Sequence, residues 1–331
     1  MFVLDSHCDT PSQMMRGLDI GIAGDRSQVD LPKLKAGGVD ASFFALYTSA
    51  DLSEDEAATK VLEMLARVYD ALDVYSEQAA LALTPEDALR NKEKGLISIF
   101  LGMENGSPIH KSLPLLRQFY RMGVRYMTLT HNGDNEIADS AAQGTRWHGL
   151  SPFGREVVDE MNRLGMIVDV AHVSDETFYD VIKCSKAPIV STHSCCRALA
   201  SHRRNMTDDM IRTLADHGGV IQINFYPVFL SDLYASFYEV KGEKASPRPG
   251  VSDVVNHIDH AVKVGGIEHV GIGTDFDGIE VTPKGLEDIS KLPKVFDQLK
   301  RKGYSEDQIE LIAGKNFLRA FNDVISSSLR A

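Results

Sequence analysis

The first ten residues contain two side chains that could hold a metal ion together. His7 and Asp9 follow a short apolar stretch and are separated by one residue. Residues at positions i and i+2 of an extended segment point to the same side. An imidazole and a carboxylate placed in this way form a mixed nitrogen and oxygen set that suits zinc. Alone the pair is a weak signal, because such residues near the start of a chain are more often ordinary polar residues.

Further ionisable side chains follow five other apolar stretches, so that six of the eight strands predicted below end in such residues. The five are Glu104, His131, His172, His193 and Asp275. In a barrel of parallel strands, the residues at the carboxyl ends of the strands share one mouth. Ionisable groups gathered there repel and desolvate one another unless a metal or a substrate compensates. The pattern therefore favours a metal site over a set of unrelated structural residues.

The number of candidate ligands indicates two metal ions. Three histidines and two carboxylates are more than a single tetrahedral zinc uses, and two cations that share one carboxylate are the economical assignment. A site of this kind holds a hydroxide at neutral pH and polarises a substrate oxygen. It needs one further carboxylate to move protons, and Asp275 is the candidate for that role.

Apolar stretches rich in β-branched residues must position these side chains. We predict strands over residues 2–4, 41–47, 96–101, 126–130, 166–170, 188–192, 220–225 and 269–273, separated by segments of helical periodicity. The sequences starting at Thr84 and Ser305 have the spacing of helix starts with a capping side chain. The fold class predicted is α/β, a (β/α)8 TIM-like barrel of the metal-dependent hydrolase type. A doubly wound open sheet is the alternative, and the lack of G-x-G-x-x-G after the first strand weakens it.

The domain organisation predicted is a single catalytic barrel over residues 1–331. The segment at about 226–250, after the seventh predicted strand, is rich in aromatic residues and then in Lys, Ser and Pro. We expect a long loop there on the active-site face, serving as a lid or a substrate-selecting element, with a dimer contact as the simpler interpretation.

Composition excludes several classes of function. A formal net charge of −12 without a basic cluster argues against nucleic acid as a partner. Four cysteines, two of them adjacent, are no disulfide framework, so reduced thiols are expected. A basic region typical of secretory signals is missing at the start, and no apolar stretch has the length of a transmembrane helix. We therefore predict a cytoplasmic protein without a membrane partner.

Taken together, the motifs resemble those of the membrane (renal-type) dipeptidases, zinc peptidases of family M19 within the amidohydrolase superfamily. The matching segments are Asp5-Ser-His7-Cys-Asp9, Gly102-Met-Glu104-Asn-Gly, Leu129-Thr-His131, Asp169-Val-Ala-His172-Val-Ser, Ser191-Thr-His193-Ser, Ser201-His-Arg-Arg204-Asn, Gly273-Thr-Asp275-Phe-Asp277-Gly and Gly314-Lys-Asn316-Phe-Leu-Arg319. They occur in the family's order and cover most of the chain. Cys8 departs from the pattern, since many relatives have Asn there, and its side chain should point away from the metals.

The resemblance implies a ligand set with two Zn²⁺ per chain. His7 and Asp9 would hold one zinc, His172 and His193 would hold the other, and Glu104 would bridge the two ions.

The resemblance also implies the catalytic and substrate-binding residues. Asp275 would take the proton of the bridging hydroxide and pass it to the leaving amine, and His131 would hydrogen-bond the substrate carbonyl oxygen. Arg204 would clamp the C-terminal carboxylate of a dipeptide, because a planar guanidinium grips a carboxylate through two bonds. Arg203 is the alternative if the register differs by one residue.

The function implied is a zinc-dependent dipeptidase that hydrolyses the peptide bond of a dipeptide by attack of a metal-bridging hydroxide. Dipeptides with a D-residue at the C-terminal position are a hypothesis for its substrates, and a homodimer is a habit of the family. The alternatives are another amidohydrolase reaction (a deaminase, or a cyclic amide or ester hydrolase) and a non-catalytic metal-binding paralogue. A hydrolase that uses Cys195 or Cys196 with a histidine ranks lower, because neither cysteine has an evident orienting partner.

Overall fold

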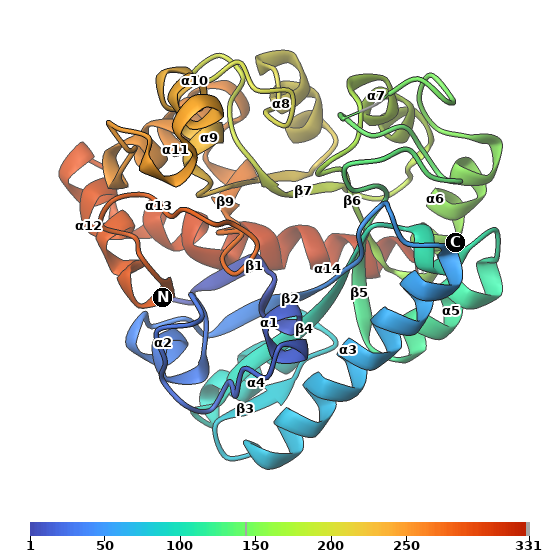
Figure 1. Ribbon diagram of the computed structural model, residues 1–331, viewed down its shortest axis with the longest axis horizontal. Helices are drawn as coiled ribbons and strands as arrows, with labels where there is room; N and C mark the ends of the chain where they lie inside the picture. Colours follow the sequence, from blue (N-terminus) through green and yellow to red (C-terminus); the bar gives the residue numbers. More distant parts are fainter. Residues whose placement is uncertain (143, 329–331) are drawn as a thin grey trace.

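The computed structural model describes residues 1–142 and 144–328 and contains a nearly closed barrel of eight parallel strands (Figure 1). Around the barrel the strands are β1 (Leu4–Cys8), β2 (Ala41–Tyr47), β4 (Ile97–Glu104), β5 (Val124–Thr128), β6 (Ile167–Asp169), β7 (Val190–Ser194), β8 (Val220–Ile223) and β9 (Val270–Ile272). Beyond β9, the carbonyl of Phe276 accepts a 2.8 Å hydrogen bond from the backbone of Asp9 and brings the last strand back to the first. The predicted (β/α)8 TIM-like fold is confirmed.

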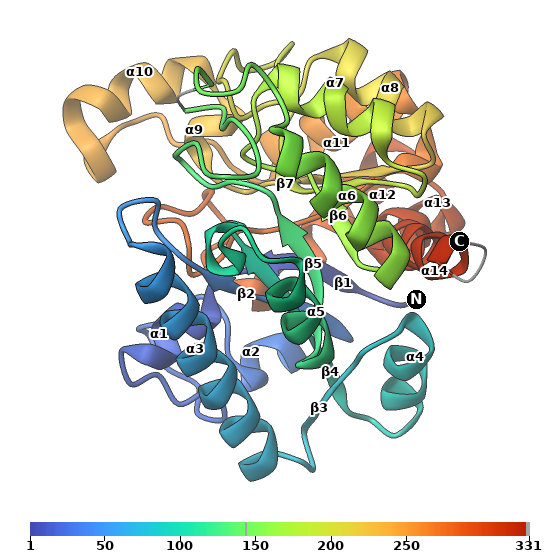
Figure 2. The same cartoon turned by 90° about the vertical axis from the view of Figure 1, so that its right-hand side faces the viewer.

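Helices follow the strands and cover the outside of the barrel (Figures 1 and 2). They are α1 (Thr10–Met15), α2 (Leu31–Ala36), α3 (Glu54–Val74), α4 (Pro85–Glu93), α5 (Leu113–Arg121), α6 (Pro152–Leu164), α7 (Asp175–Cys184), α8 (Asp208–Asp216), α9 (Pro227–Leu230), α10 (Asp232–Lys241), α11 (Val251–Gly265), α12 (Pro293–Lys302), α13 (Glu306–Glu310) and α14 (Asn316–Ser328). The helix starts predicted at Thr84 and Ser305 are confirmed, since both side chains form capping boxes. Within the two described ranges, no helix is both long enough and apolar enough to cross a bilayer.

The first predicted strand stops too early. Residues 2–4 were expected, whereas β1 continues to Cys8 because the barrel satisfies its polar side chains. The hydroxyl of Ser6, for example, donates to the carbonyls of Thr192 and Ile272 at 2.7 and 3.1 Å. β4 likewise runs past residue 101 to Glu104. A ninth strand that the sequence analysis did not predict, β3 (Ala79–Leu81), pairs with the start of β4 outside the barrel.

The segment at 226–250 is more regular than the expected loop. It contains the short helix α9 and the longer helix α10, followed by a turn of 3-10 helix. Tyr234 of α10 is fully buried and packs with Ala245 and Val281 in a small apolar cluster. This packing explains why a connection of this length is ordered.

Neighbouring residues of the strands face two different apolar layers. Phe43 and Phe100 point into the barrel, whereas the residues after them, Phe44 and Leu101, pack in the outer layer between the sheet and the helices. The inner cluster is completed by aromatic residues of α14, which runs across the barrel in Figure 1. Phe321 is fully buried there, with its ring centre 5.8 Å from that of Phe100. The last helix therefore lies across the barrel and contributes side chains to its interior.

We expect Phe321→Ala to lower the free energy of unfolding by about 3–5 kcal/mol, because the substitution leaves a cavity in a closely packed interior. Chemical denaturation followed by circular dichroism measures this loss. Val240→Ala is the matched control, since Val240 is 82% exposed on α10. An equal effect of the two substitutions would contradict the assignment of α14 to the core.

Candidate metal centre

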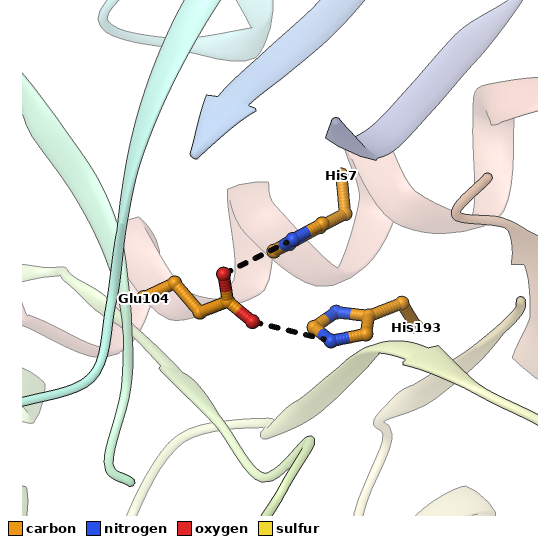
Figure 3. A group of neighbouring side chains, drawn as sticks. All are labelled: His7, Glu104 and His193. Atoms are coloured by element: carbon orange, nitrogen blue, oxygen red, sulfur yellow. Dashed lines mark ion pairs between the residues drawn. The ribbon is translucent and has the colours of Figure 1, made fainter. Parts of the chain in front are cut away.

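Three strands deliver side chains to one point at the mouth of the barrel. Figure 3 shows His7 of β1 and His193 of β7 pointing toward the carboxylate of Glu104, the last residue of β4. His7 Nε2 lies 3.6 Å from Glu104 Oε2, and His193 Nε2 lies 3.6 Å from Glu104 Oε1. Glu104 is only 3% exposed, so its charge is held within the protein.

Two further histidines approach the same carboxylate from the segments that follow β5 and β6. The Nε2 atoms of His172 and His131 lie 3.1 and 4.0 Å from Glu104 Oε1. His172 Nε2 is also 2.9 Å from His193 Nε2. The structure therefore brings all four predicted histidines to one glutamate.

Two aspartates complete the cluster on the side of His7. His7 Nε2 lies 3.5 Å from Asp9 Oδ2 and 3.9 Å from Asp275 Oδ1. The other oxygen of Asp275 accepts a 2.8 Å hydrogen bond from the amide of Asn224. Gly278 is required beside them, because a Cβ atom at that position would lie 2.2 Å from Asp9 Oδ2.

Irregularities in the backbone aim several of these side chains. From Asp5 to Cys8 the chain of β1 advances three positions while its partner strand β2 advances two, which is a β-bulge. The pairing of β7 with β8 has a similar shift between Ser191 and Ser194. Such bulges re-aim side chains beside active sites, and these two contain His7 and His193. His172 and Asp275 have φ angles of 67° and 62°, in the left-handed region that non-glycine residues seldom adopt outside functional sites.

Hydrogen bonds at Nδ1 fix the orientation of the imidazoles. His7 Nδ1 lies 2.8 Å from the Tyr126 hydroxyl, and His172 Nδ1 lies 3.2 Å from Asn132 Oδ1. The ring of Tyr126 fits over residue 102 only because that residue is glycine, where a Cβ atom would lie 2.0 Å from the ring. Partners of this kind orient histidines that bind metals.

The hydrogen bonds also define which nitrogen of His193 carries the proton. Thr192 Oγ1 donates its single hydrogen to Asp169 Oδ2 at 2.7 Å, so it accepts from His193 Nδ1 at 2.9 Å. Nδ1 of His172 likewise donates to the amide oxygen of Asn132. Both Nε2 atoms then present lone pairs when the rings are neutral.

Burial and charge set the protonation of the cluster. Burial lowers the pKa of His172 and of His193 well below its usual value, which keeps both rings neutral. Burial alone would raise the pKa of Glu104, but the positive charge of His7 outweighs it and the pKa falls well below its usual value. Burial raises the pKa of Asp275 to about 7. Burial opposes the charged form of His7, but Glu104 and Asp9 outweigh it and raise the pKa of His7 well above its usual value. The site thus combines an ionised Glu104, the neutral rings of His172 and His193, a charged His7 and a carboxyl group that titrates near neutrality.

These properties fit a metal centre. Two lone pairs that face each other at 2.9 Å repel, and a cation that accepts both relieves the repulsion. Nε2 of His7 is buried without a hydrogen-bond partner among the described residues, which is costly in a closed interior. The candidate ligands form three overlapping groups whose ligand atoms lie within 4.8 Å of one another: His7, Glu104 and His193; Glu104, His131 and His172; and His7, Asp9 and Asp275.

A cavity of about 710 Å³ opens over the cluster. Its walls include both candidate clamp residues, but Arg204 is 7% exposed whereas Arg203 lies at the surface. One Arg204 nitrogen donates to the carbonyl of His193 at 3.1 Å, and its buried Nε has no partner among the described residues. Burial lowers the pKa of Arg204 to about 10, so the guanidinium stays charged and retains a free donor.

The cysteines do not take part in this cluster. Cys8 turns away from it, as expected, and its sulfur contacts the hydroxyl of Ser42 at 3.3 Å. Cys195 and Cys196 are fully buried, and burial raises the pKa of both thiols, to about 12 for Cys196. A buried thiol that stays protonated is no nucleophile, which speaks against the Cys-His alternative.

Several residues of the site carry no signal in the sequence. Tyr126, Asn132 and Asn224 hold the histidines and Asp275 in place, yet each has an ordinary position in or after an apolar stretch. The only feature that could have pointed to them is a position close to a predicted strand end. Many residues without a role in the site share that feature.

Comparison with known proteins agrees with the geometry. The family model described as "Membrane dipeptidase (Peptidase family M19)" matches residues 1–330. A protein of Schizosaccharomyces pombe, described as an uncharacterized dipeptidase, is 38% identical over 316 residues, which are 90% of this chain and 72% of that protein.

Solved structures show the same similarity. The probable dipeptidase PvdM of Pseudomonas aeruginosa superposes with a TM-score of 0.91 at 28% identity, covering 99% of this chain and 96% of that one. A metallopeptidase of Rhodobacter sphaeroides, bound to a phosphinate mimic of the dipeptide L-Ala-D-Ala, has a TM-score of 0.88 at 25% identity, covering 98% and 99%. The chain, a metallo-dipeptidase that hydrolyses peptide bonds, therefore belongs to the membrane dipeptidase family, peptidase family M19.

Proposed function

We propose that the protein is a zinc-dependent dipeptidase with two Zn²⁺ ions bridged by Glu104. His7 and Asp9 would hold one ion, and His172 and His193 the other. The observation that carries the proposal is the sharing of Glu104 by two of the three ligand groups. Bound zinc would supply a hydroxide nucleophile at neutral pH and polarise the carbonyl of the scissile bond.

Asp275 has the geometry of a proton carrier. Asn224 holds its Oδ2, which leaves Oδ1 directed toward His7 and the rest of the cluster. With a pKa raised by burial to about 7, Oδ1 can accept a proton from the attacking water and release it to the nitrogen of the leaving amine. An acid and base group of this kind has no purpose in a protein that only binds metal, which argues against the non-catalytic alternative.

His131 and Arg204 would bind the two ends of the reacting peptide unit. Of the four histidines around Glu104, His131 lies farthest from its carboxylate, and burial lowers the pKa of His131. A neutral imidazole can donate through one nitrogen to the substrate carbonyl oxygen. Arg204, with an unpaired buried Nε, would bind the C-terminal carboxylate. A clamp at this fixed position admits one residue beyond the scissile bond, and so selects dipeptides.

The substrate class extends to dipeptides with a C-terminal D-residue. The similar Rhodobacter metallopeptidase binds a mimic of L-Ala-D-Ala. We propose that this chain accepts the same configuration, because a clamp on the carboxylate does not by itself contact the side chain of that residue. A cytoplasmic location and a homodimer stay predictions.

Metal content and activity should change together. We expect protein purified without added zinc to contain about two zinc ions per chain, as a shared-carboxylate site requires. Chelation should abolish dipeptide hydrolysis, and zinc should restore it; elemental analysis and a ninhydrin assay measure the two quantities. One metal ion or none, with no peptide cleaved after zinc is restored, would contradict the proposal.

Asp275→Asn should separate metal binding from catalysis. We expect turnover to fall by about 10²–10⁴-fold because proton transfer is lost, while zinc content is unchanged. Asp73→Asn, at an exposed position of α3, is the control and should behave as wild type. Loss of zinc from the Asp275 variant would show instead that this residue is a metal ligand.

Paired diastereomers test the configuration of the substrate. We expect hydrolysis of both L-Ala-D-Ala and L-Ala-L-Ala, with kcat/KM for each measured by release of alanine. Complete rejection of the D-containing dipeptide, with normal cleavage of the other, would rule out this part of the proposal and leave the dipeptidase assignment intact.

A further inference from the structure

We propose that the pocket selects dipeptides with an acidic side chain on the N-terminal residue, and that Lys60 recognises this side chain. The inference rests on the proposed function. It specifies which dipeptides the site prefers, a property that neither the ligand cluster nor the carboxylate clamp determines.

Lys60 lies in the wall of the catalytic cavity with no partner of opposite charge. It belongs to α3, is half-buried, and lines the same cavity as Glu104 and His131. Its ammonium lies 4.9 Å from the centre of the Tyr47 ring. The rings of Tyr47 and His131 make an edge-to-face contact, with their centroids 4.7 Å apart. Among residues 1–142 and 144–328, nothing forms a hydrogen bond or an ion pair with Lys60. The ammonium is therefore close to the reacting groups and available to a ligand.

A second cation reinforces the charge of this wall. Arg16 lies at the C-terminal end of α1, which packs against α3 (Figure 2), and it also lines the cavity. It too has no ion pair in the part of the chain that the structure describes. The carboxylates that act on Lys60, those of Asp9 and Glu104, are already engaged by the histidines of the cluster.

The cost of partly burying the charge of Lys60 is not fully offset by its neighbours. Burial lowers its pKa, although Asp9 and Glu104 act in the opposite direction. A carboxylate on the substrate would offset this cost by forming a charge-assisted hydrogen bond with the ammonium. Two further acidic residues line the cavity: Asp277 accepts hydrogen bonds from Thr10 and Gln28, and the exposed Glu280 forms no ion pair with either cation.

The position of Lys60 specifies which residue of the dipeptide it contacts. Tyr47, beneath Lys60, ends β2, whereas Arg204 packs against β7 through the carbonyl of His193. In the closed order of eight strands, three strands lie between β2 and β7 in either direction, so the two cations stand on opposite walls. A dipeptide with its C-terminal carboxylate at Arg204 and its scissile bond at Glu104 directs its N-terminal residue toward Lys60.

A purely structural role for Lys60 makes a different prediction. If its ammonium served only to pack on Tyr47 or to balance Asp9, the enzyme would not distinguish a charged N-terminal side chain from a neutral one of equal shape. L-Glu and L-Gln differ in this way, and they separate the two explanations.

The experiment compares kcat/KM for L-Glu-Ala, L-Gln-Ala and L-Lys-Ala, using for the second residue the alanine isomer that is cleaved faster. We expect the wild-type enzyme to favour Glu over Gln by about fivefold or more, the effect of one charge-assisted contact at a half-exposed site. In Lys60→Met most of this preference should be lost, with the remainder due to Arg16, and in Lys60→Glu the preference should shift to L-Lys-Ala. Arg67→Met is the matched control, because Arg67 is an exposed cation on the same helix outside the cavity, and it should keep the wild-type ratio.

The outcomes separate this inference from the proposed function. Cleavage of all three dipeptides by the wild type with equal kcat/KM would overturn the acidic preference and leave the dipeptidase assignment standing. A preference for Glu that is undiminished in Lys60→Met would overturn the role of Lys60. If the zinc-loaded wild type cleaves none of the dipeptides, the proposed function and this inference fail together. Because each result is a ratio within one protein, partial misfolding of a variant does not change its meaning.

Discussion

The site depends on the cost of keeping the charge of Glu104 inside the protein. A carboxylate with almost no solvent contact must be balanced by groups placed within a few ångströms. Four imidazoles from different strands or strand ends surround this charge, and a cation accepted by them and by the carboxylate would balance it. Each ring can approach only because the strands run parallel and end at one mouth. The chemistry at the mouth therefore depends on the register of the strands. A strand that shifted in register would move a side chain away from the buried charge of Glu104.

A second layer of buried carboxylates keeps the strand ends in register. Asp169 of β6 accepts hydrogen bonds from the hydroxyls of Thr128 and Thr192, at 2.5 and 2.7 Å, and so connects β5, β6 and β7. Asp5 of β1 accepts from the backbone and the hydroxyl of Thr274, both at 2.8 Å, and connects the first strand to the last. These bonds stabilise the bulged strands and the left-handed residues beside them, which would be strained in isolation. The side chains of the cluster are thus held by a polar framework as well as by apolar packing.

The sequence predicted the architecture because buried parallel strands are apolar and their polar ends stand out against them. Glu104 and the four histidines were visible for this reason, and the structure brings them together. Polar strand interiors were not visible: Ser6 and His7 continue β1 because partners distant in the sequence satisfy them. The bulges, and the partners Tyr126 and Asn224, depend on neighbours that only the folded chain provides. Lys60 was missed because, on a helix, a lysine facing a cavity has the same local pattern as one facing solvent.

The seating of α14 has a consequence for how the chain is made. Phe317 and Phe321 lie in the same interior cluster as Phe2 and Leu4, so residues from the two ends of the chain complete one core. During synthesis the first strands leave the ribosome long before the helix that must cover their inner aromatic residues exists. An emerging barrel therefore exposes Phe43 and Phe100 until α14 has been synthesised, and in that interval it is vulnerable to aggregation. Final closure of the barrel interior has to follow the emergence of α14 from the ribosome.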